Sequence, residues 1–236
     1  MPDLGKRLHN IHSRISQAAR RSGRNPADVQ LIAVTKNVPI ETIREAISLG
    51  VRHIGENKVQ EALEKFKELG KWKVESGHFP SLQWHLIGHL QTNKVRDAVG
   101  IFDWIHSVDS LRLAEKINQE CEKIQKVMPV LIEVNVSDEQ SKYGVHPEEL
   151  PALLEQTAAF KSIRIEGLMT MAPIVSDPTQ ARPYFQRLAR LRDQLNRGQT
   201  PISHLSMGMS QDFEAAIEEG ATMVRVGTAI FGNRSR

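Results

Sequence analysis

The feature that most constrains the fold is a strand–helix unit that recurs along the whole chain. Each unit is a short β-branched run, a turn and an amphipathic helix closed by Gly, Asn or a polar break. The β-branched runs occupy residues 29–36, 51–57, 82–88, 102–108, 127–135, 163–171, 202–207 and 223–231. Strict alternation predicts parallel strands joined by right-handed crossovers, and this many units most simply close into a (β/α)8 barrel of the TIM type. A doubly wound open sheet is the alternative.

The N-terminal segment supplies a further helix. Its residues Leu4, Leu8, Ile11 and Ile15 recur at helical spacing. The segment lacks the continuous apolar core and cleavage site of a secretory signal, so we expect it to stay on the protein. The length of 236 residues suits one barrel, and we expect residues 1–236 to form a single domain.

Proline and glycine mark the expected helix boundaries. Pro39 and Pro147 stand near the first turns of two helices, because proline is tolerated where the N–H has no helical partner. Gly50, Gly70 and Gly220 follow amphipathic stretches and predict helix ends, because glycine adopts the left-handed conformation of a C-terminal stop.

Composition excludes several classes of protein. Hydrophobic residues make up 40% and charged residues 25% of the chain, and no apolar run reaches the roughly 18 residues of a membrane span. Cys121 is the only cysteine, so no intrachain disulfide can form and a cytoplasmic location fits best. The net charge of +3 is densest at Arg20, Arg21 and Arg24, where basic side chains also suit a helix C-terminus. We therefore expect neither nucleic-acid nor membrane binding.

The first candidate for chemistry is Lys36, at the exit of the first predicted strand. In a barrel, active sites lie at the C-terminal ends of the strands. Period-two alternation puts Lys36 on the same face as Ile32 and Val34, which aims its amine into the mouth of the barrel. Such a lysine suits Schiff-base chemistry if burial or a nearby cation such as Arg225 favours its neutral form. A rim lysine that simply reaches solvent is an equally good interpretation of its position.

Two small-residue turns predict a phosphate site. Ser206, Gly208 and Ser210 lie between the seventh predicted strand and the next helix, where free backbone N–H groups favour an anion. Gly227 and Thr228 form a second turn in the eighth predicted strand. The loops after strands seven and eight build the phosphate site of many barrels.

Arg225 shares one face of the last strand with Gly227, so its side chain should point inward, close to whatever the phosphate anchors. Alternatively, it is an inward arginine paired with a carboxylate such as Glu133.

Other residues carry weaker signals. His85 and His89 have the spacing of metal ligands on a helix, but they fall on a strand and its exit, so we expect no metal site. Lys142 and Tyr143 lie in the loop after the fifth strand and are candidates for an acid, a base or a lid, although loops are polar by default. The chain has no Walker motif, dinucleotide fingerprint or nucleophile elbow.

Several of these segments together resemble the pyridoxal phosphate homeostasis protein family. The likeness rests on LIAVTKNVP around Lys36, HIGEN at 53–57, WHLIGHLQTNK at 84–94, LSMGMSQDFEAAIEEG at 205–220 and VRVGTAIFG at 224–232. It covers nearly the whole chain, with the motifs in the same order.

The resemblance implies a barrel of PLP fold type III, similar to the N-terminal domain of alanine racemase. By this resemblance, Lys36 carries pyridoxal 5′-phosphate (PLP) as a Schiff base, Asn57 lies beside the cofactor ring and Arg225 faces the pyridine nitrogen. An arginine there disfavours a protonated ring nitrogen and makes the cofactor a weaker electron sink. The phosphate contacts implied are Ser206, Gly208, Gly227 and Thr228.

The resemblance also directs the functional hypotheses. Alanine racemases complete their acid–base pair with a second, C-terminal β domain, which we expect this chain to lack. The leading hypothesis is therefore a cytoplasmic, monomeric PLP-binding protein that stores the cofactor and delivers it to PLP-dependent apo-enzymes, without assured catalysis of its own. A low-activity PLP-dependent amino-acid racemase or lyase using Tyr143 or Lys142 is the alternative, and a Schiff-base aldolase acting on sugar phosphates is a third.

Overall fold

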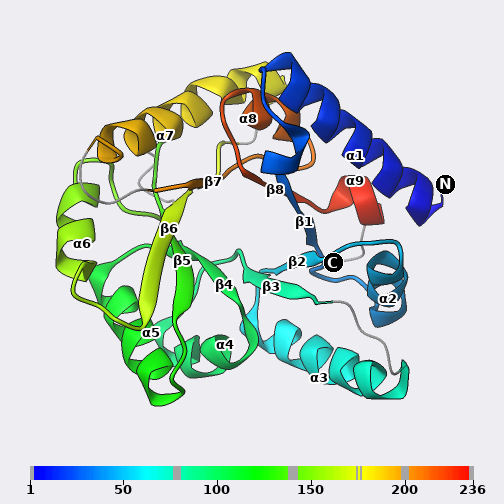
Figure 1. The fold of residues 1–236 in the computed structure, drawn as a ribbon, viewed down its shortest axis with the longest axis horizontal. Helices are drawn as coiled ribbons and strands as arrows, with labels where there is room; N and C mark the ends of the chain where they lie inside the picture. Colours follow the sequence, from blue (N-terminus) through cyan, green and yellow to red (C-terminus); the bar gives the residue numbers. More distant parts are fainter. Residues whose placement is uncertain are drawn as a thin grey trace.

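The structure is a computed structural model that describes residues 3–76, 81–137, 143–173, 175, 177–197 and 202–233. Its centre is a closed barrel of parallel strands in chain order, and its helices form a ring around them (Figure 1). The strands are β1 (Gln30–Val34), β2 (His53–Glu56), β3 (Gln83–Leu86), β4 (Trp104–Val108), β5 (Met128–Glu133), β6 (Ile163–Met169), β7 (His204–Ser206) and β8 (Met223–Val226).

The helices alternate with the strands, as the sequence predicts. Three short 3-10 turns, Pro26–Asp28, Thr92–Lys94 and Pro178–Ala181, accompany them. The helices are α1 (Leu4–Arg21), α2 (Ile40–Ser48), α3 (Val59–Ser76), α4 (Val95–Ile101), α5 (Leu111–Lys123), α6 (Leu150–Thr157), α7 (Arg182–Leu195), α8 (Phe213–Glu218) and α9 (Thr228–Phe231). Among the described residues, no helix combines the length and the apolarity that a membrane crossing needs.

Closure of the barrel depends on the pairing of the first and last strands. β1 and β8 run parallel, with Ile32 beside Arg225 and Ala33 beside Val226. This pairing excludes the open doubly wound sheet and confirms the barrel. It also brings the exit of β1, where Lys36 lies, next to the exit of β8.

Two apolar layers hold the fold together. The larger fills the space between strands and helices, and in α1 it takes up the predicted face of Leu4, Leu8, Ile11 and Ile15. The smaller is a separate cluster contributed by strands alone, within the barrel. Its members are Ile32, Leu131, Met169 and Met223. Burying such side chains stabilises the fold by about 1.5–3 kcal/mol each.

The largest departures from the predicted boundaries lie at α3 and β8. Helix α3 continues through Gly70 to Ser76, because a helix tolerates one glycine when the packing of its other residues outweighs a cost of about 1 kcal/mol. The eighth strand ends at Val226, and residues Thr228–Phe231 form the short helix α9 instead of strand. Gly50 and Gly220 do end helices, each with a positive φ.

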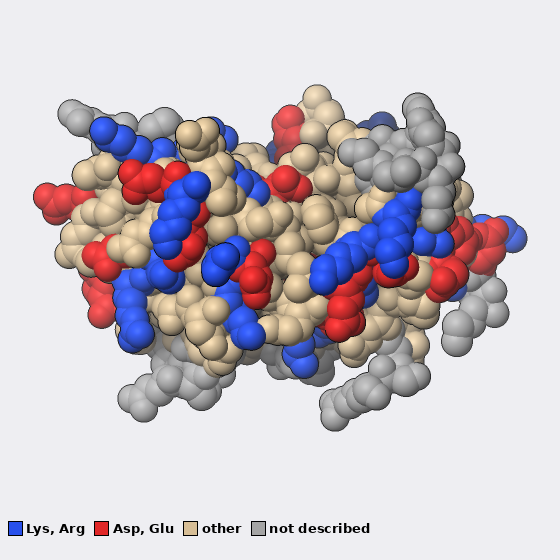
Figure 2. All heavy atoms as spheres, turned by 90° about the horizontal axis from the view of Figure 1, so that it is seen from below, with Lys and Arg blue, Asp and Glu red and all other residues tan. Residues whose placement is uncertain are grey.

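Two arginines of the basic cluster at the end of α1 have structural partners. Arg24 donates hydrogen bonds to the carbonyls of Ile217 and Ala221 at the end of α8, at 2.9 and 2.8 Å, and Arg21 forms an ion pair with Glu218 at 2.7 Å. On the face shown in Figure 2, Lys and Arg side chains lie among Asp and Glu side chains. Both observations favour a structural role for these charges; the expectation of no nucleic-acid binding stays a prediction.

Candidate functional site

A cavity of about 570 Å³ lies at the C-terminal ends of the strands. It has the size of a small-molecule site. Five of the predicted site residues line it: Lys36, Asn57, Arg225, Gly227 and Thr228. The exits of β1, β2 and β8, which are far apart in the sequence, thus meet at one place.

Lys36 follows β1 and extends the inward face of that strand. Val34, two residues earlier, lines the same cavity, as period-two alternation predicts. After Lys36 the backbone turns sharply at Asn37, which has a φ of +54° and whose N–H donates to Glu61 at 2.5 Å. The turn ends the strand at the cavity, so Lys36 lies at the mouth of the barrel and lines the cavity.

Arg225 forms a fixed cation at the cavity. Only 3% of its surface is exposed, and its guanidinium donates to the carbonyl and the hydroxyl of Ser206 at 2.8 and 2.6 Å and to the carbonyl of Thr170 at 2.9 Å. Burial lowers the pKa of Arg225 to about 10, so it still carries its charge at neutral pH. Glu133 is the carboxylate that the sequence suggested as a partner of Arg225. Its charge acts against the lowering of the Arg225 pKa.

Two carboxyl groups near Arg225 have raised pKa values. Burial, together with the charge of Asp109, raises the pKa of Glu133 to about 7. Burial also raises the pKa of Asp212, whose carboxylate accepts the N–H of Met209 at 2.6 Å. Because the pKa of Glu133 is about 7, its carboxyl group is partly protonated at neutral pH and offsets the positive charge of Arg225 only in part, which suits an anionic ligand.

The loop after β7 forms one wall of the cavity. Of its two serines, Ser210 and not Ser206 faces the cavity. Ser210 lines the cavity, and its hydroxyl accepts the N–H groups of Gly227 at 3.1 Å and Ala229 at 3.4 Å. Ser206 does not appear in the lining, because β7 ends there with the hydroxyl turned into the barrel, under Arg225. The resemblance implied Ser206 as a phosphate contact, whereas the cavity lining contains Ser210, because β7 ends at Ser206.

Gly208 shapes that loop from outside the lining. Its φ is +90°, and a Cβ there would lie 2.5 Å from the Cβ of Ala216 and 2.9 Å from the Cα of Phe213. Only glycine allows the loop to pass so close to α8. Gly88 similarly allows a close approach of the backbone at Asn57, since a Cβ on Gly88 would lie 2.4 Å from the Asn57 carbonyl oxygen.

Tyr143, one of the two predicted acid–base residues, lies outside the cavity lining. Lys142 falls outside the described residues. Tyr143 is 59% exposed and stacks on the ring of His89 with centroids 3.9 Å apart, away from the cavity lining. His89 is itself 3.3 Å from a carboxylate oxygen of Asp109. Within the described ranges, no three His, Cys, Asp or Glu side chains are grouped to hold a metal ion.

The lining fits a phosphorylated aldehyde with a flat ring. Lys36 offers an amine, Arg225 a fixed cation, and the turns at Ser210 and Gly227 polar groups for a phosphate. Apolar side chains complete the walls for a ring: Val34, Ile87, Met171 and Val175. An amine, a fixed cation and polar turns thus lie at one cavity.

The comparisons with known proteins agree with this geometry. The family model described as alanine racemase, N-terminal domain, matches residues 7–235. The pyridoxal phosphate homeostasis protein of Aquifex aeolicus is 45% identical over 230 residues, which cover 97% of each chain. The protein of the same name from Escherichia coli K12 is 40% identical and covers 99% of this chain and 98% of its own.

Solved structures show the same fold. PipY of Synechococcus elongatus, with PLP bound, is 39% identical, has a TM-score of 0.82 and covers 98% of this chain and all of its own. An alanine racemase from Clostridium difficile shares the fold at 16% identity, with a TM-score of 0.72; this chain covers 58% of it.

Fold and site together define a barrel of the alanine racemase type with a lysine, an arginine and two small-residue turns at its mouth. Within that class, the chain belongs to the pyridoxal phosphate homeostasis protein family.

Proposed function

We propose that this chain binds PLP in the cavity at the barrel mouth and takes part in PLP homeostasis. The observation that carries the proposal is the convergence of Lys36, Asn57, Arg225 and the Gly227–Thr228 turn on one cavity. The printed names of the relatives and the PLP bound to PipY support it. PLP supplies an aldehyde that joins amines as a Schiff base, and a ring that withdraws electrons.

Each residue has a proposed part. Lys36 supplies the amine for covalent attachment, and Asn57 borders the ring. Gly227, Thr228 and Ser210 contact the phosphate. Ser206 and Gly208, predicted as phosphate contacts, act indirectly: Ser206 positions Arg225, and Gly208 lets the loop take its path.

Arg225 is proposed to face the pyridine nitrogen. A cation at that place disfavours protonation of the ring nitrogen, so the bound cofactor withdraws electrons weakly and amino acids react slowly on it. Such a site is better suited to binding PLP than to PLP-dependent catalysis. We also propose that the chain acts in the cytoplasm as a monomeric, single-domain barrel and passes PLP to apo-enzymes.

The racemase or lyase alternative finds less support. Racemisation needs an acid and a base on opposite faces of the substrate carbon. Tyr143, the second group offered by the sequence, lies against His89 outside the cavity lining. The relatives with the homeostasis name are 36–45% identical, whereas the alanine racemase comparison stands at 16%.

The decisive experiment uses absorption and chemical trapping. Purified protein with added PLP should show the visible band of a Schiff base, and borohydride reduction followed by peptide mass mapping should place the label on Lys36. Lys36→Ala should lose the band. Lys58→Ala, at an exposed lysine next to Asn57, is the matched control and should keep it. Unchanged affinity and spectrum in Lys36→Ala would overturn the assignment of Lys36.

A further inference from the structure

Three histidines form a hydrogen-bonded chain through the interior of the barrel that ends at Arg225. His53 Nδ1 lies 3.1 Å from His85 Nε2, and His85 Nδ1 lies 2.9 Å from His106 Nε2. His106 Nδ1 lies 3.0 Å from the hydroxyl oxygen of Ser206, and that oxygen accepts the Arg225 guanidinium at 2.6 Å. This histidine chain lies outside the described lining of the cavity at the barrel mouth.

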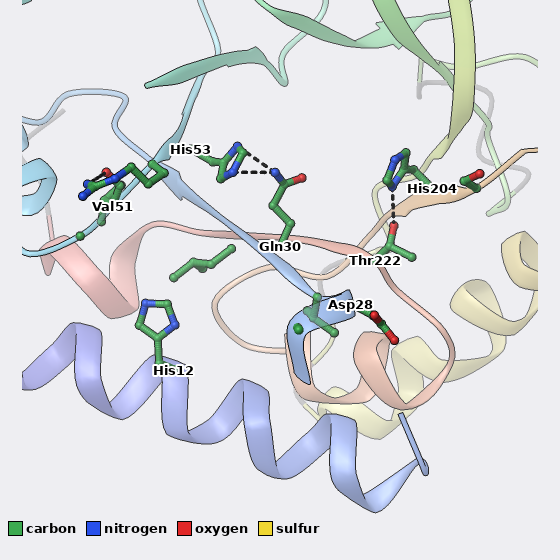
Figure 3. Close-up of a pocket in the computed structure, with 13 residues that line it drawn as sticks. His12, Asp28, Gln30, Val51, His53, His204 and Thr222 are labelled. Carbon is green, nitrogen blue, oxygen red and sulfur yellow. Dashed lines mark hydrogen bonds between the residues drawn. The ribbon is translucent and has the colours of Figure 1, made fainter. Parts of the chain in front are cut away.

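The far end of the histidine chain is closed by Gln30 on β1 (Figure 3). The amide nitrogen of Gln30 lies 2.7 Å from Nε2 and 2.8 Å from Nδ1 of His53. Both ends therefore contact groups of the protein itself: an amide on β1 and, through Ser206, a guanidinium on β8. The chain thus connects residues of β2, β3 and β4 to the opposite side of the barrel.

The histidine chain occupies a place that barrels normally fill with branched apolar side chains. His85 and His106 are fully buried, and the ring of Trp104 stacks on His85 with centroids 5.9 Å apart. Buried polar rings are costly unless they are hydrogen-bonded, and both nitrogens of His85 and of His106 have partners. Apolar side chains would fill the same space without that requirement, which points to a role other than packing.

The links of the histidine chain require one common tautomer. Burial lowers the pKa of all three rings, and those of His85 and His106 well below the usual range, so the rings are neutral at physiological pH. A neutral imidazole has one N–H and one acceptor nitrogen. Each link joins Nδ1 of one ring to Nε2 of the next, so neighbouring rings must carry their protons on the same type of atom. The rings therefore act as one unit.

Arg225 is the residue of the cofactor cavity that this unit contacts, through Ser206. The guanidinium also donates to the carbonyls of Ser206 and Thr170, at 2.8 and 2.9 Å. The strands fix these carbonyls, whereas the Ser206 hydroxyl can rotate between staggered positions. His106 holds the hydroxyl in the position that accepts Arg225. Within the described ranges no carboxylate pairs with Arg225, so these neutral acceptors set its position.

We infer that His106, His85 and His53 are positioning residues for Arg225, which hold its guanidinium at the cofactor cavity through the hydroxyl of Ser206. The effect of each should decrease with the number of links between it and Ser206, from His106 to His53. The inference rests on the proposed PLP function only where it concerns the cofactor. There, a guanidinium fixed at the pyridine nitrogen keeps that nitrogen unprotonated, and a looser one does so less.

The first experiment needs no PLP. Proton–nitrogen NMR of protein labelled with ¹⁵N-arginine reports rotation of the Arg225 guanidinium about its Nε–Cζ bond, and Arg225→Lys assigns the signal. His106→Phe should speed this rotation by about fivefold, the equivalent of one hydrogen bond. His106→Asn should rotate at close to the wild-type rate, because its amide can take the place of ring Nδ1. An unchanged rate in His106→Phe would overturn the inference.

The same measurement on ¹⁵N-histidine protein reports the tautomer of each ring. His85 and His106 should carry their protons on the same type of nitrogen, since one hydrogen bond joins them. Different tautomers at these two residues would show that the link is absent and would overturn the unit.

His204→Phe is the matched control for loss of stability alone. His204 is, like His53, a half-buried ring near the strand starts, but it contacts Thr222 at 3.3 Å (Figure 3). Its replacement should leave the rotation of Arg225 unchanged, whatever urea unfolding shows. His53→Phe should speed the rotation less than His106→Phe, and it keeps the test open if the deeper variant does not fold. Equal acceleration by His204→Phe and His53→Phe would indicate general loosening and overturn the positioning role.

The second experiment measures the consequence for the cofactor. PLP labelled with ¹⁵N in its ring should give the signal of an unprotonated pyridine nitrogen when it is bound to the wild type. In His106→Phe that signal should move toward the protonated position at the same pH, and the affinity for PLP should fall by about fivefold. His204→Phe should change neither.

The two experiments separate the inference from the proposed function. Failure of the wild type to bind PLP contradicts the proposed function, while the rotation of Arg225 still decides the positioning role. An unchanged ring-nitrogen signal in His106→Phe, together with faster rotation of Arg225, contradicts the contact between Arg225 and the pyridine nitrogen and supports the positioning role alone.

Discussion

The ammonium of Lys65 lies 2.8 Å from the buried carboxylate of Glu56 and also donates to the Thr35 carbonyl at 2.6 Å. Thr35 in turn donates its hydroxyl to Glu56 at 2.6 Å. Thr35 immediately precedes Lys36, and Glu56 immediately precedes Asn57. One side chain from α3 therefore ties together the ends of β1 and β2, which carry two residues of the proposed PLP site.

Replacing Lys65 tests how much its contacts with Glu56 and Thr35 stabilise the fold. Lys65→Met should lower the free energy of unfolding by about 3–5 kcal/mol, because it leaves the carboxylate of Glu56 buried without its cation. Urea unfolding measures the loss. Lys71→Met is the matched control: Lys71 pairs with Glu68 at 2.7 Å on the same helix, but both are well exposed, so the change should stay within about 1 kcal/mol. Equal losses in the two variants would contradict a special role for the Lys65–Glu56 pair.

Replacing Ser206 and replacing Ser210 should have different effects on the affinity for PLP and for pyridoxal. Ser210→Ala removes the acceptor for two backbone N–H groups in the turn proposed to contact the phosphate, at a cost of about 1–3 kcal/mol, so PLP affinity should fall roughly tenfold or more. Pyridoxal, which has no phosphate, should bind this variant as it binds the wild type. Ser206→Ala should weaken both ligands alike, because it removes one of the three hydrogen bonds that hold Arg225 in place. A loss confined to PLP in Ser206→Ala would return Ser206 to the phosphate site.

Glu133 should make stability depend on pH. Its pKa is about 7 in the folded protein against 4.5 for the free side chain, so the folded state binds the proton more tightly. Its contribution is fully present below pH 4.5 and is lost as the pH rises to about 7, by about 3 kcal/mol in all. Glu133→Gln cannot ionise and should gain stability relative to the wild type across that window. Urea unfolding at several pH values measures the difference, and a constant difference would contradict the raised pKa.

Cys121 should be inert in the native protein. It is fully buried, and burial raises the pKa of its thiol to about 11, so little thiolate exists at neutral pH. Iodoacetamide should label it slowly in buffer and readily in denaturant, as followed by intact-mass measurement. Cys121→Ala serves as the unlabelled control, and rapid labelling of the folded protein would show that α5 opens locally.

Much of the site could be predicted because its signals are local. Alternation along β1 puts Ile32, Val34 and Lys36 on one face whatever the rest of the chain does. Recurring strand–helix units predicted the barrel, and the barrel rule then pointed to the strand exits. Both steps use only neighbouring residues and the number of units.

The sequence alone therefore determined the alternation of elements, the inward face of each strand and the position of Lys36 at a strand exit. Tertiary structure decided which side chains meet: Ser210 rather than Ser206 at the cavity, Lys65 beneath Glu56, and His53, His85 and His106 in one chain. The physical reason is that hydrogen bonds and ion pairs act over about 3 Å, and these partners come from different elements. The pairing of neighbouring strands and the packing of helices on them bring these partners within that distance.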